Sequence, residues 1–237
     1  MEQTEPPPYD GPERYDATDT IHPVILVLAG RYIHSESTSS PVLYELDHDV
    51  SFLSRAEHKV VFWRHERRVR TSSQHGGGGG GGVRTSSYQR HLFNLESPHA
   101  VTSTSKYAFF LTSVSRKALG NVGLLKKKKT PSVPRLGGGF RVMQISRGPA
   151  AAGEDEELFE ITRKDGRYEW WEGDGRRVAI EDTAANGQLK MIITTALPRQ
   201  RADVLVAMWC LRLWHDAALN QDTSLLSGVK KKLGIGR

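Results

Sequence analysis

The chain has 237 residues, of which 38% are hydrophobic and 25% charged, and its formal net charge is +6. This composition permits one large domain with a core and sizeable polar loops. The charge is uneven, because residues 1–20 carry six acids and one arginine (net −5), which leaves +11 for the rest. A basic body attracts nucleic acid, anionic lipid or acidic protein, and a solvated basic surface is the alternative interpretation.

Three features of the sequence indicate the cellular compartment. Cys210 is the single cysteine, which excludes an intramolecular disulfide, and no Asn-x-Ser/Thr acceptor occurs. The N-terminus lacks a signal-peptide pattern. The longest apolar run, residues 204–211, is shorter than the roughly 20 residues that a spanning helix needs. We therefore expect a cytoplasmic protein, peripheral to a membrane at most, that is neither secreted nor membrane-spanning.

The predicted strands follow an N-terminal tail. Residues 1–20 combine prolines and acids with few apolar groups, which predicts a disordered segment. Short β-rich runs bounded by turn residues then predict strands. These runs are residues 24–29, 42–46, 59–64, 90–95, 107–114, 119–125 and 140–145.

The region 157–197 predicts an antiparallel meander. Three turn signals, Asp165-Gly166, Gly173-Asp174-Gly175 and Asn186-Gly187, separate four short strand-like runs. Asp-Gly favours a two-residue hairpin because both positions accept positive φ. The four runs are residues 158–162, 168–171, 178–181 and 189–195.

Three segments are predicted to be flexible insertions in a domain spanning residues 21–220. Residues 66–88 hold seven consecutive glycines between two copies of Val-Arg-Thr-Ser-Ser, which is typical of a linker and lacks the Gly-Lys-Ser/Thr of a phosphate loop. The other two insertions are residues 126–139 and 148–157, and residues 221–237 form a basic C-terminal tail.

A hydrophobic helix is predicted near the C-terminus, with Asp203 as its N-cap. Residues 204–211 are apolar on every side of the helix, so protein should surround them. We therefore expect a mostly-β fold, a closed antiparallel barrel of about 11–12 strands around this helix. The rival interpretation is a β-sandwich with the helix packed on one face.

This arrangement resembles the tubby C-terminal domain superfamily, which includes tubby-like proteins, LURP-one-related proteins and phospholipid scramblases. The likeness covers about residues 21–220 and is nearest to an uncharacterised fungal branch. The local segments that carry it are Tyr44-Glu45-Leu46, Leu119-Gly120-Asn121-Val122, the Trp170-Trp171 run and residues 206–214. The resemblance implies a barrel that binds phosphoinositide headgroups through basic residues.

No catalytic constellation is found in the sequence. His65-Glu66 lacks a second histidine, since Val69 stands at that position, and no Gly-x-Ser-x-Gly occurs. Neighbours in Asp47-His48-Asp49 point to opposite faces of a strand, which disfavours a metal pair. Cys210 lies on the buried helix, where thiols are inert. We expect no enzyme activity, no cofactor and no metal.

The sharpest short motif is Pro6-Pro7-Pro8-Tyr9, which matches the Pro-Pro-x-Tyr ligand of WW domains. Its prolines favour the polyproline II conformation that fits an aromatic groove. The predicted partner is a WW-domain protein such as a HECT-type ubiquitin ligase. A chance match in a proline-rich tail is the alternative.

Basic clusters supply candidate lipid contacts, since clustered cations attract anionic membranes. The lipid-binding candidates are Arg67, Arg68, Lys126, Lys127, Lys128 and Lys129. Arginine three residues before Ser73 and Ser87 fits basophilic kinases, which makes these serines candidate phosphorylation sites. Nucleic acid ranks third as a partner, because the aromatics are expected in the core and not on a stacking surface.

The leading hypothesis is a non-enzymatic tubby-like adaptor that contacts anionic lipid through basic loops and presents a WW ligand on its tail. The alternatives are a scramblase-like lipid-handling protein and a structural barrel without a specific ligand.

Overall fold

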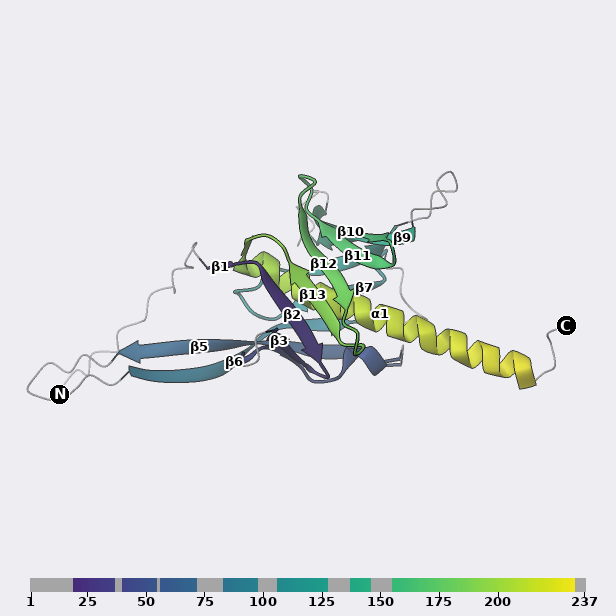
Figure 1. Cartoon of the computed structure of the whole chain (residues 1–237), viewed down its shortest axis with the longest axis horizontal. Helices are drawn as coiled ribbons and strands as arrows, with labels where there is room; N and C mark the ends of the chain where they lie inside the picture. The colour runs from purple at the N-terminus through teal and green to yellow at the C-terminus, as the bar shows by residue number, and fades with distance from the viewer. Residues whose placement is uncertain are drawn as a thin grey trace, which may run out of the picture.

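The computed structural model describes residues 19–36, 40–54, 56–71, 83–97, 106–127, 137–145 and 155–232. Twelve strands form a closed barrel in which each strand pairs antiparallel with the next, and β13 pairs with β2 to close it (Figure 1). The mostly-β closed barrel is therefore confirmed, and the β-sandwich is excluded. The strands are β2 (Val24–Ala29), β3 (Tyr32–Ser35), β4 (Val42–Leu46), β5 (Lys59–Thr71), β6 (Val83–Glu96), β7 (Phe109–Ser113), β8 (Val122–Lys126), β9 (Gly137–Gln144), β10 (Glu156–Lys164), β11 (Arg167–Trp171), β12 (Arg177–Thr183) and β13 (Leu189–Ile193).

The predicted meander is confirmed in β10–β13. The hairpin between β10 and β11 turns through Asp165 and Gly166, whose φ angles are 50° and 82°. Two positive φ values in a row define the turn that matches the twist of paired strands. The sequence therefore specifies this hairpin locally.

One helix, α1 (Arg199–Lys232), occupies the barrel. Every residue from 202 to 215 is buried, which for a helix means that protein surrounds it on all sides. The largest enclosed side chains include Trp209 and Trp214 on the helix and Trp170 on β11. Beyond the barrel, α1 continues outward (Figure 1).

The predicted N-cap at Asp203 is wrong. The helix begins at Arg199, directly after a two-stranded sheet in which β1 (Thr20–Ile21) pairs with β14 (Leu197–Pro198). Asp203 therefore lies one turn inside the helix and is fully buried. An ion pair between Arg199 and Asp19, with an Nε–Oδ1 distance of 2.9 Å, holds the start of the described chain beside the start of α1.

Several strand boundaries differ from the sequence-based expectation. The strand β3 was not predicted, and β5 and β6 extend into the region 66–88 that was expected to be a flexible insertion. Trp63, Phe110 and Trp171, which were expected in the core, are only half-buried because they alternate with inward-facing neighbours.

Within the described residues, no helix combines the length and the hydropathy that crossing a membrane requires.

Candidate functional site

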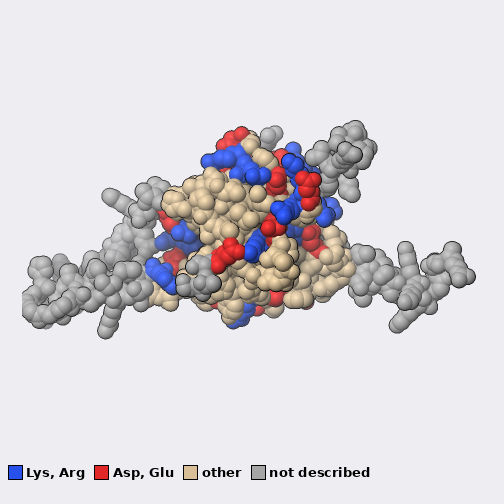
Figure 2. Space-filling view, in the orientation of Figure 1, with Lys and Arg blue, Asp and Glu red and all other residues tan. Residues whose placement is uncertain are grey.

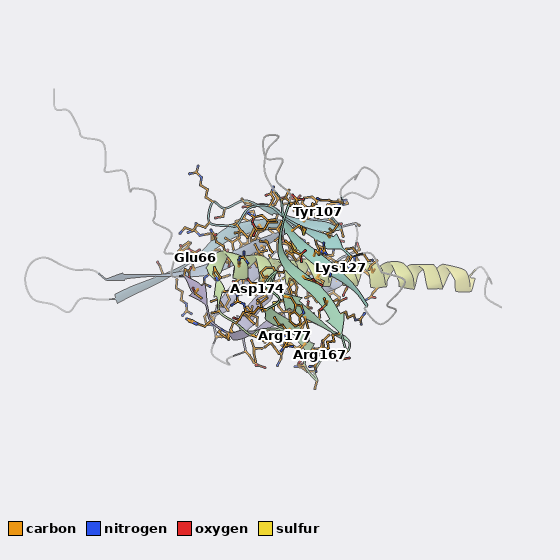
Figure 3. The ribbon with its side chains drawn as sticks, turned by 90° about the horizontal axis from the view of Figure 1, so that it is seen from above. Glu66, Tyr107, Lys127, Arg167, Asp174 and Arg177 are labelled. Atoms are coloured by element: carbon orange, nitrogen blue, oxygen red, sulfur yellow. The ribbon has the colours of Figure 1, made fainter. Side chains whose placement is uncertain are left out.

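A two-stranded arm projects from one end of the barrel. Residues 65–71 of β5 and 83–89 of β6 form backbone ladders only with each other in the described part of the chain, because β4 pairs with β5 no further than Arg64 and β7 pairs with β6 only from Phe93. We call these two segments the arm. Figures 1 and 3 both show it leaving the barrel at the end opposite to the one where α1 emerges.

One face of the arm continues the inner face of the barrel. On β5 this face passes from the buried Phe62 and Arg64 to positions 66, 68 and 70, since alternate residues share a face. The opposed positions on β6 are 90, 88, 86 and 84. The arm is therefore rooted in the core beside the start of α1.

At the root, Arg64 joins the arm to the helix. Its Nη1 donates to Oδ2 of Asp203 at 2.5 Å, and Tyr44 on β4 donates its hydroxyl to Oδ1 of the same carboxylate at 2.9 Å. Asp203 is fully buried, and Arg64 is nearly so. Both carboxylate oxygens thus have partners from the barrel wall, and the pair fixes α1 relative to β4 and β5.

The next inward-facing position along β5 is Glu66, whose carboxylate accepts hydrogen bonds from three residues. Arg64 donates to Oε1, Arg90 donates to both oxygens at 2.7 and 3.1 Å, and the Tyr88 hydroxyl donates to Oε2. Figure 3 labels Glu66 at the root of the arm. We call Tyr44, Arg64, Glu66, Tyr88, Arg90 and Asp203 the arm-base network. Its two carboxylates balance its two arginines.

The two carboxylates of this network differ in acidity. Burial raises the pKa of Asp203 to about 6, although Arg64 and the Tyr44 hydroxyl oppose that shift. At Glu66 the partial burial that would raise the pKa is outweighed by hydrogen bonds from Arg90, Tyr88 and Arg64, and the pKa falls to about 2. The difference follows from solvent access and donor number.

Farther out, the arm carries positive charge without acidic residues. Residues 67–71 and 83–87 contain Arg67, Arg68, Arg70 and Arg84 and no aspartate or glutamate. The register places Arg70 directly opposite Arg84 and Arg68 opposite Ser86 on the face that carries Glu66. Arg67 lies on the other face, opposite Ser87, and is exposed without an ion pair to any described side chain.

The predicted lipid-binding residues do not lie together. Arg67 and Arg68 are on the arm, whereas Lys126 and Lys127 lie at the other end of the barrel, where Figure 3 labels Lys127. Lys127 pairs with Glu160, while Lys126 is exposed. These four candidates therefore lie in two separate places, because β5 and β8 present them at opposite ends of the barrel, and lipid binding by either pair stays a prediction.

Several predicted positions lie outside the described residues. They are the WW-ligand residues Pro6, Pro7, Pro8 and Tyr9, the lysines Lys128 and Lys129, and the serine Ser73. Ser87 is described and exposed on β6, opposite Arg67, and its phosphorylation stays a prediction.

Charged side chains on the barrel are mostly paired. Figure 2 shows basic and acidic residues interspersed on the visible face. Pairs such as Arg141–Glu157 and Arg177–Glu169 illustrate this pattern. Such local compensation leaves little net charge on that face.

A second buried ion pair lies deeper along α1. Arg212 donates from Nε to Glu181 on β12 at 2.6 Å and from Nη1 to Asp216 at 2.6 Å. The Trp170 indole also donates to Glu181 at 2.9 Å, and the Tyr168 ring lies 4.1 Å from the Arg212 guanidinium. These partners are fully engaged with one another, which indicates a structural role.

The groups considered for chemistry have structural partners. Asp47 and Asp49 accept backbone hydrogen bonds from Val61 and Ser51. Among the described residues, no three His, Cys, Asp or Glu side chains gather as a metal site. Burial raises the pKa of the Cys210 thiol, which keeps it protonated and unreactive.

A surface hollow of about 740 Å³ lies along the outer side of β10 and β11. Its lining includes Thr162, Glu169, Trp171 and Glu172. Glu172 is bound by Arg176 and Arg201, and Trp171 donates to the Thr162 hydroxyl. The lining glutamates are ion-paired within the barrel, whereas Arg163, Lys164 and Asp165 of the same lining are exposed.

Comparison with known proteins gives no match among family models, curated proteins or solved structures. The closed twelve-stranded antiparallel barrel with one C-terminal helix is nevertheless consistent with a tubby-like fold. The arm is the candidate functional site, because the sequence of its two strands is rich in arginine.

Sequence reasoning missed the arm-base network, although it identified Arg70 and Arg84 as the arginines that precede Ser73 and Ser87. The available signal was the alternation of charged residues at 64, 66, 68 and 70, together with the two Val-Arg-Thr-Ser-Ser copies. Alternation at period two indicates a strand. The glycine run between the copies directed attention to a linker instead.

Proposed function

We propose that this protein is a non-enzymatic, tubby-like binding module that attaches to anionic membrane lipid, phosphoinositide in particular, through its arm. The observation that supports this proposal is the excess of arginine over acidic residues in the sequence of the two arm strands, beside a barrel in which many described charges are paired. Clustered cations near a membrane contribute about 1 kcal/mol each. The closed barrel acts as a rigid base for the arm.

The N-terminal segment supplies the second half of the proposal. β1 holds the chain beside the start of α1, at the end of the barrel that carries the arm (Figure 1). We propose that the Pro-Pro-Pro-Tyr motif of residues 6–9 recruits a WW-domain protein to the membrane-bound barrel. An adaptor of this kind needs no active site.

Vesicle flotation tests the lipid half. Three vesicles are compared: neutral phosphatidylcholine, the same lipid with phosphatidylinositol bisphosphate, and the same lipid with phosphatidylserine at matched charge. We expect recovery with bisphosphate to exceed recovery with phosphatidylserine, and both to fall as salt screens the arginines. Equal recovery on neutral vesicles would remove the lipid assignment.

A titration with a WW domain tests the adaptor half. The full chain should bind, and Tyr9→Ala should abolish binding because the tyrosine fills its own pocket. Tyr32→Ala, a tyrosine on β3, is the control and should bind as the unmodified chain does. Unchanged affinity for Tyr9→Ala would exclude the motif as the ligand.

A further inference from the structure

The hollow on the outer side of β10 and β11 has a tryptophan in its wall. Trp171 is half-buried and faces outward, because its neighbour Trp170 is fully buried in the core. Glu160 lies directly opposite Trp171 in the strand register. Thr162 lies directly opposite Glu169, and all four side chains line the hollow. We call Glu160, Thr162, Glu169 and Trp171 the hairpin patch.

The dimensions of the hollow suit a small ligand that spans the patch. Opposed residues in an antiparallel pair have Cα atoms about 5 Å apart, and next-but-one residues on a strand are about 7 Å apart. The volume of about 740 Å³ is within the range of small-molecule sites. Gly173 and Gly175 also line the hollow, and no described atom lies within 4 Å of a Cβ built at either glycine. The hollow is therefore open beside the tryptophan.

The polar groups of the hairpin patch are each oriented by one contact and can make another. The indole donates to the threonine hydroxyl at 3.2 Å, which leaves the hydroxyl proton for a further acceptor. Lys127 donates to Oε1 of Glu160, and Arg177 donates to Oε1 of Glu169 at 3.0 Å. Among the described residues, neither Oε2 atom has a hydrogen-bond partner. The patch thus offers one oriented donor and two oriented acceptors beside an indole.

The charges around the patch balance, which favours a neutral ligand. Each of the two carboxylates has a cation as its counter-charge. An anionic ligand would meet the two glutamates. A cationic ligand would have to displace Lys127 and Arg177, and the guanidinium of Arg177 also lies 6.0 Å from the centre of the Trp171 ring. A neutral molecule with many hydroxyl groups can use the donor and both acceptors without breaking either ion pair.

We infer that the hairpin patch is a binding site for a neutral saccharide. The apolar C–H face of a sugar ring packs on the indole of Trp171. Hydroxyl groups of the sugar donate to Oε2 of Glu160 and of Glu169, and another accepts from Thr162. The inference goes beyond the proposed function and does not depend on it, because β10 and β11 are not neighbours of the arm strands β5 and β6 in the barrel.

The experiment is isothermal titration of the full chain with three neutral trisaccharides, maltotriose, cellotriose and triacetylchitotriose, and with the cationic peptide triarginine. The first test variant is Trp171→Ala. Its control is Trp63→Ala, which removes another half-buried tryptophan, on β5 and outside the lining of the hollow.

A second pair of variants keeps the test valid if Trp171→Ala does not fold. Glu169→Ala removes an acceptor of the patch together with its ion pair to Arg177. Glu36→Ala is the control, because it removes a glutamate that pairs with Lys190 outside the lining of the hollow. Thermal unfolding of each variant checks that the barrel is folded.

We expect the unmodified chain to bind at least one trisaccharide and to bind triarginine more weakly. Trp171→Ala should weaken saccharide binding at least about tenfold, since it removes the apolar surface under the ring. Glu169→Ala should weaken it about tenfold, since a hydrogen bond to a charged group is lost. Both controls should bind as the unmodified chain does.

Three results would overturn the inference. They are a lack of binding to all three trisaccharides, tighter binding of triarginine than of any saccharide, and equal affinities for the folded test variants and their controls. Vesicle flotation is a separate measurement, so each of these results leaves the proposed function standing.

Discussion

The root of the arm and the rest of its sequence differ in the acids that accompany their arginines. At the root, Arg64 and Arg90 share Glu66, and Arg64 also binds Asp203, so positive and negative charges balance. Residues 67–71 and 83–87 contain four arginines and no acidic residue. The comparison teaches that the partners of an arginine, more than its presence, identify a structural role.

The physical basis of the difference is burial. A buried arginine without a counter-charge is costly, so the root needs its carboxylates for the barrel to fold. An exposed arginine such as Arg67 stays hydrated and costs little, so the arm tolerates it without an ion pair to a described side chain.

The largest expected effect is on the buried end of the arm-base network. Asp203→Ala leaves the Tyr44 hydroxyl and a guanidinium nitrogen of Arg64 without an acceptor inside the protein. We expect the free energy of unfolding to fall by about 3–5 kcal/mol, measured by urea denaturation. Glu156→Ala, which removes an exposed acid, should cost less than about 1 kcal/mol. Similar losses for the two variants would contradict the expected difference between a buried and an exposed carboxylate.

Glu66→Gln tests the carboxylate that lies between Arg64 and Arg90. The neutral amide retains part of the hydrogen bonding but removes the charge between Arg64 and Arg90, and we expect a loss of about 1–2 kcal/mol in urea denaturation. The same substitution leaves Arg90 without its counter-charge, while Arg64 keeps Asp203. Affinity for bisphosphate vesicles should therefore rise about fivefold. A drop in affinity would indicate that Glu66 itself contacts the ligand or that the arm has lost its shape.

The pH dependence of stability should differ between the two carboxylates. The pKa of Glu66 is lowered from 4.5 to about 2, so its contribution is complete above pH 4.5 and disappears as the pH falls toward 2. The pKa of Asp203 is raised from 3.8 to about 6, so its contribution is complete below pH 3.8 and disappears as the pH rises toward 6. Urea denaturation as a function of pH measures both.

Each substitution should remove the pH dependence of the free energy of unfolding in the range where its carboxylate titrates. Glu66→Gln should remove the change below pH 4.5, and Asp203→Ala the change between about pH 4 and 6. Identical pH profiles for the unmodified chain and the two variants would show that other groups control the titration.

The smallest expected effect is at Arg67, on the opposite face of the arm. Arg67→Gln removes one exposed charge on the face of the arm opposite to the one that carries Glu66. We expect affinity for bisphosphate vesicles to fall less than about fivefold and the free energy of unfolding to change by less than about 0.5 kcal/mol. A loss of affinity greater than about fivefold would mean that Arg67 contributes more to lipid binding than one exposed charge does.

The sequence predicted the elements whose signals are local. The runs at β2 and β4 have the predicted bounds, and the Asp165-Gly166 hairpin forms because both residues accept positive φ. The enclosed helix followed from apolar residues on all its sides. Each of these features depends on a few adjacent residues.

The features that the sequence did not predict depend on distant partners. Asp203 reads as an N-cap because it precedes an apolar run, yet its acceptor groups serve Tyr44 and Arg64, more than a hundred residues earlier. The strand β3 is short and polar, and only pairing with β2 and β4 stabilises it. Seven consecutive glycines weaken the strand signal on either side, so the sequence favours a linker where the structure has the arm.

Hydrogen exchange of the full chain, with and without inositol trisphosphate, tests the central claim most directly, because it locates the ligand along the backbone. We predict slower exchange in peptides covering residues 65–71 and 83–89, and no change in β8, where Lys126 lies. Protection centred on β8, with exchange of the arm unchanged, would contradict the account.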